Sequence, residues 1–217
     1  MATIPVPIPT PIYHITLGHN LRAILQAGGL KCWNELQQTG TNYTTIAYSH
    51  IQDRRAAKQV PCGPQGTLHD YVPFYFAPRS PMLFTISQGN VPSFSKGQRP
   101  VLHLVSTAQE VDQAGLQYVF TNGHGTMHYT DFFDDLAQLD QVDWSVMPLR
   151  DWYDTLQSPD RKRKRQAEFL VHGFVPWNLV TEIGVIDDGI RSAVEAVFES
   201  EGAAHRPVVN VQRTWYY

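Results

Sequence analysis

The sequence predicts a single mixed α+β domain over residues 1–217, preceded by a proline-rich lead at 1–11. Strand-like and helix-like segments are mixed along the chain without an internal repeat, and no stretch has the composition of an interdomain linker. With 217 residues, of which 42% are hydrophobic, the chain can bury a full core. Two irregular stretches, 31–69 and 77–99, are longer than a scaffold requires, and loops of that length are usually functional or disordered.

The first part of the chain is expected to hold a strand and two short helices. Ile12–Thr16 alternates in polarity and is typical of a strand. Asn20 is a preferred capping residue, and the helix after it is expected to end at Gly28–Gly29. Residues 37–50 are polar without periodicity and predict a loop, whereas Asp53–Val60 is compatible with a short helix.

The middle of the chain has the clearest strand signals. Tyr71–Phe76 is aromatic and strand-like, although Pro73 has no N–H to donate and favours an edge strand or a bulge. Val101–Val105 has the composition of a buried strand. A helix at Ala108–Ala114 and a strand at Tyr118–Thr121 are expected to follow.

The last third is predicted to complete the sheet and to add two helices. The second of these helices is amphipathic and buries one apolar face. The expected elements are a helix capped by Thr130 or Asp131 and containing Phe132, Phe133 and Leu136, strands at Glu168–Val171 and Leu179–Ile186, a helix from near Asp188, and a closing strand within Val208–Trp215.

Composition limits the class of protein. The formal net charge of −3 is not typical of a nucleic-acid-binding protein, so any nucleic acid must be bound by a local patch of positive charge. Cys32 and Cys62 have no framework spacing, which favours a reducing compartment. The N-terminus has no basic region of the signal-peptide kind, and no run is long enough to span a membrane. We therefore expect a soluble, cytoplasmic protein without a membrane partner.

A run of five cations, Arg161–Arg165, leads directly into an apolar strand-like segment that carries one carboxylate, Glu168. If the strand includes Gln166, that side chain and Glu168 project to the same side. Most strand glutamates simply face solvent. Here the apolar neighbours favour a carboxylate that lines a cleft, with cations at the mouth of the site, which suits a negatively charged substrate.

Several other side chains suit a phosphorylated or planar ligand. Arg79 lies in a turn fixed by two prolines, and a guanidinium is the preferred group for bidentate phosphate recognition. Alternation places Tyr71 and Tyr75 on one side of their strand, where they could stack on a planar ring. His14 taken alone is expected to be a structural strand residue.

Motifs for metals and for common cofactors are missing from the sequence. His124 and His128 are four residues apart, but they flank a glycine-containing turn and no HExxH or CxxC accompanies them. A Walker loop, a GxGxxG after a strand and a GxSxG are also absent. We therefore expect no metal site, and the sequence does not support an NTPase, a Rossmann enzyme or a serine hydrolase.

Four segments follow one another in a distinctive order. They are Tyr13-His14-Ile15-Thr16, the Arg54-Arg55 pair, the long block from Leu68 to Leu83, and Arg165-Gln166-Ala167-Glu168-Phe169-Leu170-Val171. Their order closely resembles the DarT family, bacterial toxins that ADP-ribosylate DNA using NAD. The resemblance covers residues 11–186 and implies an ADP-ribosyltransferase-like fold, in which a split, strongly bent mixed sheet with surrounding helices grips NAD. It also implies a macrodomain antitoxin as partner.

The resemblance assigns roles to individual residues. Glu168 matches the catalytic glutamate, and one of Arg54 and Arg55 matches a catalytic arginine that also contacts NAD. Tyr71 or Tyr75 matches the aromatic wall near the nicotinamide. The remaining predicted NAD contacts, led by the ribose contact of His14, are His14, Thr16, Asn20 and Leu21.

A mechanism follows from physical chemistry as a hypothesis. Cleavage of the nicotinamide–ribose bond builds positive charge on the ribose, which a carboxylate in a dry site stabilises. The acceptor in DarT-like enzymes is a base in single-stranded DNA, typically a thymidine ring nitrogen, which must lose its proton before it attacks. Glu168 is the candidate base, with Arg54 or Arg55 stabilising the deprotonated ring.

Single-stranded DNA requires cations for its backbone and flat or apolar surfaces for its bases. The predicted DNA contacts are Arg161, Arg163 and Arg165 for the backbone, and Arg79, Met82 and His124 for the bases.

Three alternatives remain open from the sequence. The same fold could modify guanine or a protein. The chain could instead be a nucleic-acid-binding module with a decayed site. A metal-dependent nuclease built on His69, Asp70 and His124 is the third, and it is not favoured because no metal motif supports it.

Overall fold

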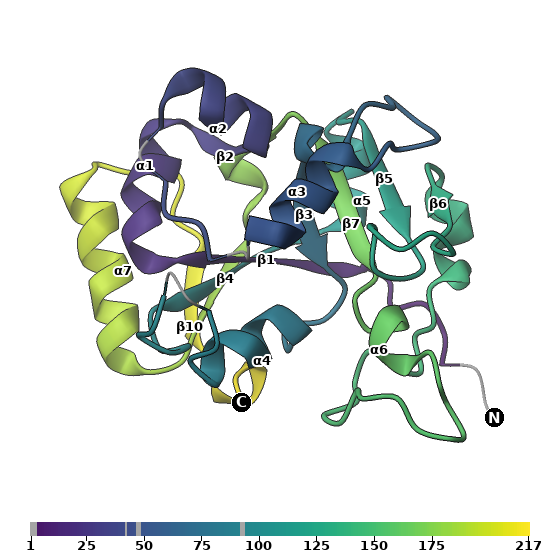
Figure 1. Ribbon diagram of the computed structural model, residues 1–217. Coiled ribbons are helices and arrows are strands. Elements are labelled where there is room, and N and C mark those ends of the chain that lie inside the picture. The colour runs from purple at the N-terminus through teal and green to yellow at the C-terminus, as the bar shows by residue number, and fades with distance from the viewer. Residues whose placement is uncertain (1–3, 42, 47–48, 92–93) are drawn as a thin grey trace.

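The computed structural model describes residues 4–41, 43–46, 49–91 and 94–217; residues 1–3 of the predicted lead and small parts of the two predicted irregular stretches lie outside this description. Within it, eight strands form one sheet in the order β10-β9-β4-β1-β3-β7-β5-β6, and β2 pairs with β8 separately (Figure 1). The strands are β1 (Pro11–Leu17), β2 (Gly29–Lys31), β3 (Tyr71–Tyr75), β4 (Val101–Thr107), β5 (Tyr118–Thr121), β6 (Phe132–Phe133), β7 (Glu168–His172), β8 (Phe174–Pro176), β9 (Glu182–Val185) and β10 (Val208–Val211).

Helices pack around this sheet, as predicted for a mixed α+β fold. In Figure 1, α1 and α7 lie at the β10 end of the sheet, and α3 lies over β3. No helix in the described ranges is both long and apolar enough to cross a membrane. The helices are α1 (Leu21–Gln26), α2 (Trp33–Thr39), α3 (Ser49–Ala57), α4 (Pro81–Ser87), α5 (Ala108–Gln113), α6 (Arg161–Lys164) and α7 (Asp188–Ser200).

The sheet is split between β1 and β3. Strand β1 pairs with β4 along its whole length, but with β3 only at Tyr13 opposite Tyr75. The parallel pair of β9 and β10 makes the sheet mixed, since its other described pairs are antiparallel. The predicted split, mixed sheet is therefore confirmed, and the split leaves room beside β3 for a ligand.

Pro73 lies in the middle of this sheet, so the prediction of an edge strand or a bulge is wrong. Strand β3 is flanked by β1 and β7, and Pro73 pairs with Leu170. Its carbonyl points towards β1 and accepts a hydrogen bond from His14 Nδ1 at 2.8 Å. Because the N–H and C=O of a strand residue point to the same side, the missing donor faces the gap and removes no bond to β7.

Long-range packing overrules the helix expected after Thr130 or Asp131. Phe132 and Phe133 form the short strand β6 against β5, and the Phe133 ring stacks on Phe120 with centroids 5.2 Å apart. A 3-10 turn at Leu136–Gln141 follows. Phenylalanine is itself favoured in strands, and a cross-strand aromatic pair of this kind stabilises so short a strand.

Smaller differences concern helix ends and caps. Helix α3 occupies Ser49–Ala57, four residues earlier than expected, so part of the predicted 37–50 loop is helical. Asn20 stands directly before α1 but its side chain does not cap the helix. It instead donates to Thr44 O at 2.9 Å and accepts from Thr44 N at 3.0 Å. The strand predicted over Leu179–Ile186 begins later, at Glu182, because Trp177–Leu179 forms a 3-10 turn.

Candidate active site

A cavity of about 490 Å³ opens where β1, β3 and β7 meet beneath α3. This size is typical of a site for a small molecule or cofactor. The walls combine apolar and aromatic groups with a few charged ones. Six of the predicted site residues line the cavity together with Arg55, and these six are His14, Tyr71, Tyr75, Met82, His124 and Glu168.

Glu168 is the buried carboxylate of this cavity. It is the first residue of β7, only 4% exposed, and it pairs with Tyr75 of β3 across the sheet. Its Oε2 accepts from Arg55 Nη1 at 2.7 Å, and its Oε1 accepts from the Gly125 N–H at 3.1 Å. Its own N–H donates to Thr121 Oγ1 at 2.9 Å. Both carboxylate oxygens and the backbone are therefore fixed in place.

These donors keep Glu168 ionised. Burial alone would raise the pKa of the carboxyl group, but the Arg55 guanidinium and the hydrogen bonds from Arg55 and Gly125 hold that pKa below its ordinary value. A buried carboxylate needs such pairing, because an isolated charge in a low-dielectric interior is very costly.

The structure distinguishes the two arginines that the sequence left open. The side chain of Arg55 is 11% exposed and reaches Glu168, whereas Arg54, the preceding residue of α3, is exposed. Neighbouring residues of a helix point in directions about 100° apart, so only one of the pair can face the sheet. The Nη2 of Arg55 is buried and has no hydrogen-bond partner among the described groups. That nitrogen is available to a ligand.

His14 presents an acceptor to the cavity. Its Nδ1 lies 2.8 Å from the Pro73 carbonyl, which can only accept, so Nδ1 carries the hydrogen. Burial lowers the pKa of His14, and the ring is therefore neutral. Its Nε2 then holds a lone pair, and this atom is buried without a partner in the described part of the chain. A ligand hydroxyl is the kind of donor that would satisfy it.

Two tyrosines of β3 were predicted to form an aromatic wall. Tyr71 and Tyr75 both line the cavity. The Tyr71 hydroxyl donates to the Gln65 carbonyl at 2.6 Å, which fixes its ring. Burial and the charge of Glu168 raise the pKa of Tyr75, so its hydroxyl stays protonated beside the carboxylate.

Three residues predicted to contact NAD do not line the cavity but lie behind its lining residues. Thr16, Asn20 and Leu21 are buried and do not line the cavity. Thr16 Oγ1 is 2.9 Å from the hydroxyl of Tyr43, and Asn20 holds the neighbouring Thr44 backbone. These residues therefore position Tyr43, a wall residue that the sequence did not single out because its segment shows no periodicity.

A loop between β5 and β6, residues 122–131, supplies two further groups. Gly125 donates its N–H to Glu168, and a Cβ at this position would lie 3.2 Å from Oε1. His124 Nδ1 accepts from the Thr126 N–H at 3.2 Å, so in the neutral ring the hydrogen is on Nε2. Burial lowers the pKa of His124, with the charge of Glu168 opposing this. His124 is therefore a neutral donor.

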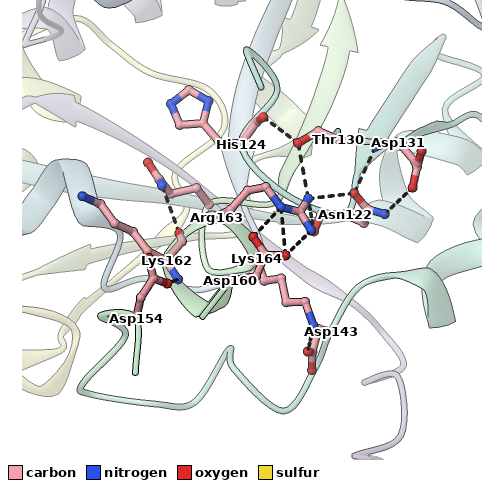
Figure 2. A network of polar contacts seen from close by, with 11 residues as sticks. Asn122, His124, Thr130, Asp131, Asp143, Asp154, Asp160, Lys162, Arg163 and Lys164 are labelled. Carbon is pink, nitrogen blue, oxygen red and sulfur yellow. Dashed lines mark hydrogen bonds and ion pairs between the residues drawn. The ribbon is translucent and has the colours of Figure 1, made fainter. Parts of the chain in front are cut away.

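Arg163 anchors this loop to α6. Figure 2 shows its guanidinium between Asp160 on one side and Asn122 and Thr130 on the other. Its Nη2 lies 2.6 Å from Asp160 Oδ2, and its backbone carbonyl accepts from the His124 N–H at 3.1 Å. The side chain is only 11% exposed. Its donors are thus engaged inside the protein, which leaves little for the DNA contact that the sequence predicted.

The rest of the basic run is divided among several roles. Lys164 is paired with Asp143, and Arg165 is buried. Arg161 does not line the cavity, but Lys162 does, as do Gln166 and the rim residue Trp152. The sequence did not predict that Lys162 and Trp152 line the cavity. Nothing in the basic run shows which of its cations faces the site, and Trp152 lies in a segment without periodicity. Arg79 does not line the cavity, and it precedes α4, the helix that carries Met82.

The groups of the alternative nuclease site do not converge. The Asp70 carboxylate accepts from Thr67 and from Asn34, which fixes it away from the cavity. His69 is bonded to Gln52. In the ranges that the structure describes, no cluster of three or more His, Cys, Asp or Glu residues could hold a metal ion.

Known proteins are similar to this chain in sequence and in fold. The family model described as "ssDNA thymidine ADP-ribosyltransferase, DarT" matches residues 13–217. A DNA ADP-ribosyl transferase from Thermus aquaticus is 47% identical over 97% of this chain and 90% of its own length. A structure of Thermus sp. 2.9 DarT in complex with ADP-ribosylated ssDNA superimposes with a TM-score of 0.94 and 43% identity, covering 100% of both chains. The same relative in complex with NAD+ gives 0.89 and 42% identity, over 98% and 100% of the two chains.

The split sheet and the buried glutamate, taken with these similarities, define an NAD-dependent DNA ADP-ribosyltransferase. More narrowly, the chain belongs to the DarT family. The resemblance stated from the sequence is thereby confirmed, as are the predicted fold and the predicted class of enzyme.

Proposed function

We propose that the enzyme transfers ADP-ribose from NAD to the ring N3 of thymidine in single-stranded DNA and releases nicotinamide. The observation that carries this proposal is the buried, ionised Glu168, whose two oxygens are held by Arg55 and by the Gly125 N–H inside a cavity of suitable size. Two structures of one relative, at 42–43% identity, contain the two ligands: ADP-ribosylated ssDNA in one and NAD+ in the other.

The NAD end of the cavity is the end near His14. The unpartnered Nε2 of His14 accepts a hydrogen bond from a ribose hydroxyl, and this contact fixes the sugar. Tyr71 and Tyr75 offer ring faces to the flat nicotinamide. Both features support a position of the nicotinamide-bearing ribose next to Glu168, since Tyr75 and Glu168 are paired across neighbouring strands.

The transfer breaks one bond to C1′ of that ribose and makes another. The C1′–nitrogen bond of NAD breaks and its electron pair leaves with nicotinamide. Glu168 takes the N3 proton of thymine, and the N3 electron pair forms the new bond to C1′. A positioned base is worth about 10²- to 10⁴-fold in rate. In the free enzyme the hydrogen bond from Arg55 makes Glu168 a weaker base. When the Arg55 guanidinium turns its Nη1 and its unpartnered Nη2 towards the thymine carbonyl, Glu168 becomes a stronger base again.

The donors around Glu168 favour thymine over guanine. The carboxylate accepts, while Arg55 on its Oε2 side and the Gly125 N–H on its Oε1 side donate. Thymine presents the complement of this pattern, an N–H between two carbonyl groups. The N1–H of guanine instead lies between a carbonyl and an amino group, and the amino hydrogens would face a donor. A buried donor left unpaired in this way is costly.

A series of single-stranded oligonucleotides tests this choice. Each carries one target base in an otherwise polyadenine strand: thymidine, deoxyuridine, N3-methylthymidine or deoxyguanosine. Mass spectrometry after incubation with NAD should find ADP-ribose on thymidine and also on deoxyuridine, which keeps the same three groups. Modification of N3-methylthymidine or of deoxyguanosine would contradict the proposal.

We further propose that this activity makes the protein the toxin of a toxin–antitoxin pair, countered by a macrodomain antitoxin that removes the ADP-ribose. This proposal rests on the family membership, and it requires that the enzyme meets DNA in the cytoplasm. Induced expression of the wild type should stop DNA replication, and co-expression of the macrodomain partner should restore growth. Equal growth of cells expressing the wild type and Glu168→Ala would sink it.

A further inference from the structure

Thr121, the last residue of β5, has a buried hydroxyl that contacts the backbone of Glu168. The residue is 0% exposed, and its Oγ1 accepts a hydrogen bond from the Glu168 N–H at 2.9 Å. The backbone pairing of β5 with β7 ends one residue earlier, at Phe120 opposite Phe169. The Thr121 hydroxyl therefore continues the contact where the backbone ladder stops, and it holds the first residue of β7 in place.

The same hydroxyl also holds the loop that follows β5. It donates its hydrogen to the Gly123 carbonyl at 2.7 Å, whereas the Glu168 carbonyl lies farther away, at 3.5 Å. A hydroxyl group can donate one hydrogen bond while it accepts others. A single buried oxygen thus joins the start of β7 to the loop of residues 122–131.

Two successive peptide groups of this loop connect the Thr121 contact to the carboxylate. In the first group, Thr121 holds the Gly123 carbonyl. In the second group, the Gly125 N–H donates to Glu168 Oε1 at 3.1 Å. Thr130 Oγ1 donates to the carbonyl of this second group at 2.9 Å, as Figure 2 shows. Because each peptide group is planar, fixing its carbonyl also fixes the direction of its N–H.

We propose that Thr121 is a positioning residue for the catalytic base, and that it acts on both partners of the hydrogen bond between Gly125 and Glu168. It holds Glu168 from the strand side and the Gly125 N–H from the loop side. Thr121 does not line the cavity, so it acts through these two residues. The inference rests on the proposed role of Glu168 as the base. Such positioning matters because a misplacement of about 1 Å can reduce a rate by about 10²-fold.

Hydrogen exchange of the Gly125 amide, measured by NMR without NAD or DNA, tests this role in Thr121→Val. Valine keeps the β-branched shape but lacks the hydroxyl, so the loop is no longer tied to β7. The Gly125 amide should then exchange about tenfold faster than in the wild type, because its hydrogen bond to the carboxylate opens more often. Thr121→Ser keeps the hydroxyl and should exchange at the wild-type rate.

Steady-state kinetics of DNA ADP-ribosylation should follow the same order. Thr121→Val should lower kcat by about tenfold or more and leave the KM for NAD and for the oligonucleotide unchanged, because Thr121 contacts neither substrate. Thr121→Ser should restore most of the rate. The Arg55 guanidinium and the Gly125 N–H both hold the pKa of Glu168 low. Loss of the second bond should therefore move the acid limb of the kcat profile to higher pH.

Thr10→Val is the matched control. The Thr10 hydroxyl is equally buried and donates to the Pro7 carbonyl at 2.7 Å, but Thr10 does not line the cavity and has no contact with the loop of residues 122–131 among those described. Both valine variants should lower the Tm, since each removes a buried hydrogen bond. If Thr121→Val also lowers only the Tm, with Gly125 exchange and kcat as in the wild type, the positioning role is wrong.

Thr121→Cys repeats the test if Thr121→Val folds poorly. A thiol forms weaker hydrogen bonds than a hydroxyl, so exchange of the Gly125 amide should again be faster than in the wild type. Unchanged exchange in this variant would overturn the inference.

The exchange measurement does not depend on the reaction. A wild type that fails to modify thymidine would sink the proposed function, while the effect of Thr121→Val on Gly125 exchange would still decide the positioning role. Normal thymidine modification by the wild type, together with wild-type exchange and kcat in Thr121→Val, would leave the proposed function standing and overturn this inference alone.

Discussion

Arg55 Nη1 and Glu168 Oε2 lie 2.7 Å apart although 113 residues separate them in the sequence. This buried pair joins α3 to the first residue of β7, and it fixes the carboxylate on which the proposed chemistry depends. It also explains why the free enzyme is stable with a charge in its interior, since each group compensates the other. The pair leads to separate predictions for activity and for stability.

Arg55 and Arg54 should differ sharply in activity. Arg55→Ala removes the donor that holds Glu168 and should reduce DNA ADP-ribosylation by about 10²- to 10³-fold, the usual cost of losing one preorganised charge-stabilising group. Arg54→Ala, a matched change at an exposed position, should leave the rate near that of the wild type. The measurement is the initial rate of adduct formation on a thymidine-containing oligonucleotide. A larger loss for Arg54→Ala would show that α3 presents its other face.

The pairing of Glu168 should make stability depend on pH. Because the folded pKa of Glu168 lies below its ordinary value of 4.5, ionisation stabilises the fold above that value, and this contribution is lost as pH falls through the lower folded pKa. Glu168→Gln cannot titrate. The difference in unfolding free energy between the wild type and Glu168→Gln should therefore shrink as the pH is lowered from 7 to 3. A difference that grows on acidification would contradict the assigned direction.

A side chain at position 123 should destabilise the protein, because Arg163 occupies the space beside Gly123. A Cβ at Gly123 would collide with Arg163 Nη1. Gly123→Ala should displace the guanidinium from Asn122 and Thr130 and destabilise the protein by about 1.5–3 kcal/mol, the range for a hydrogen bond to a charged group. The loop should then release the Gly125 N–H from Glu168, and DNA transfer should fall.

Gly18→Ala is the matched control for this change, because its Cβ would meet its nearest neighbour at an ordinary 3.5 Å. Thermal unfolding and transfer rates of the two variants are compared with those of the wild type. If Gly123→Ala lowers the Tm but leaves the KM for DNA and the transfer rate unchanged, Arg163 has no role in positioning the loop.

Raising the salt concentration should weaken DNA binding much more than it slows the reaction of NAD alone. Single-strand binding loses affinity with a slope of about −0.7 per phosphate contact in a plot of log K against log salt. Since Arg163 and Lys164 are ion-paired, few cations remain for the strand, and the slope should correspond to about two or three contacts. Nicotinamide release in the absence of DNA should change much less. Equal salt sensitivity of both reactions would count against a separate electrostatic DNA track.

Elements with strong local patterns were predictable. Strand β5 was placed at its observed bounds and α7 at its observed start, because continuous apolar runs and a 3.6-residue periodicity are properties of the local sequence. The Glu168 strand was also identified from its apolar neighbours. Strand β6 was not, because Phe133 is held by Phe120 across the sheet, and the local sequence contains no sign of that partner.

Among the site residues, too, those marked by local sequence were predictable and those positioned by tertiary contacts were not. The sequence drew attention to Glu168 and to the Arg54–Arg55 pair, but the choice between the arginines depends on the phase of α3 relative to the sheet. The basic run is uniform in sequence, but its residues have different environments because they lie on different sides of α6 and at its end. Arg165 is buried, Arg163 and Lys164 are ion-paired, and Lys162 lines the cavity. Tyr43 and Gly125 gained their positions from loops that only tertiary contacts fix.

The most direct test of the central claim is mass spectrometry of a single-stranded thymidine oligonucleotide after incubation with NAD and either the wild type or Glu168→Gln. The isosteric change keeps the shape of the site and removes the base. The wild type should add one ADP-ribose at thymidine and release nicotinamide in equal amount, while Glu168→Gln should retain strand binding and lose the adduct. Equal adduct formation by both proteins, or an adduct at another base, would contradict the account.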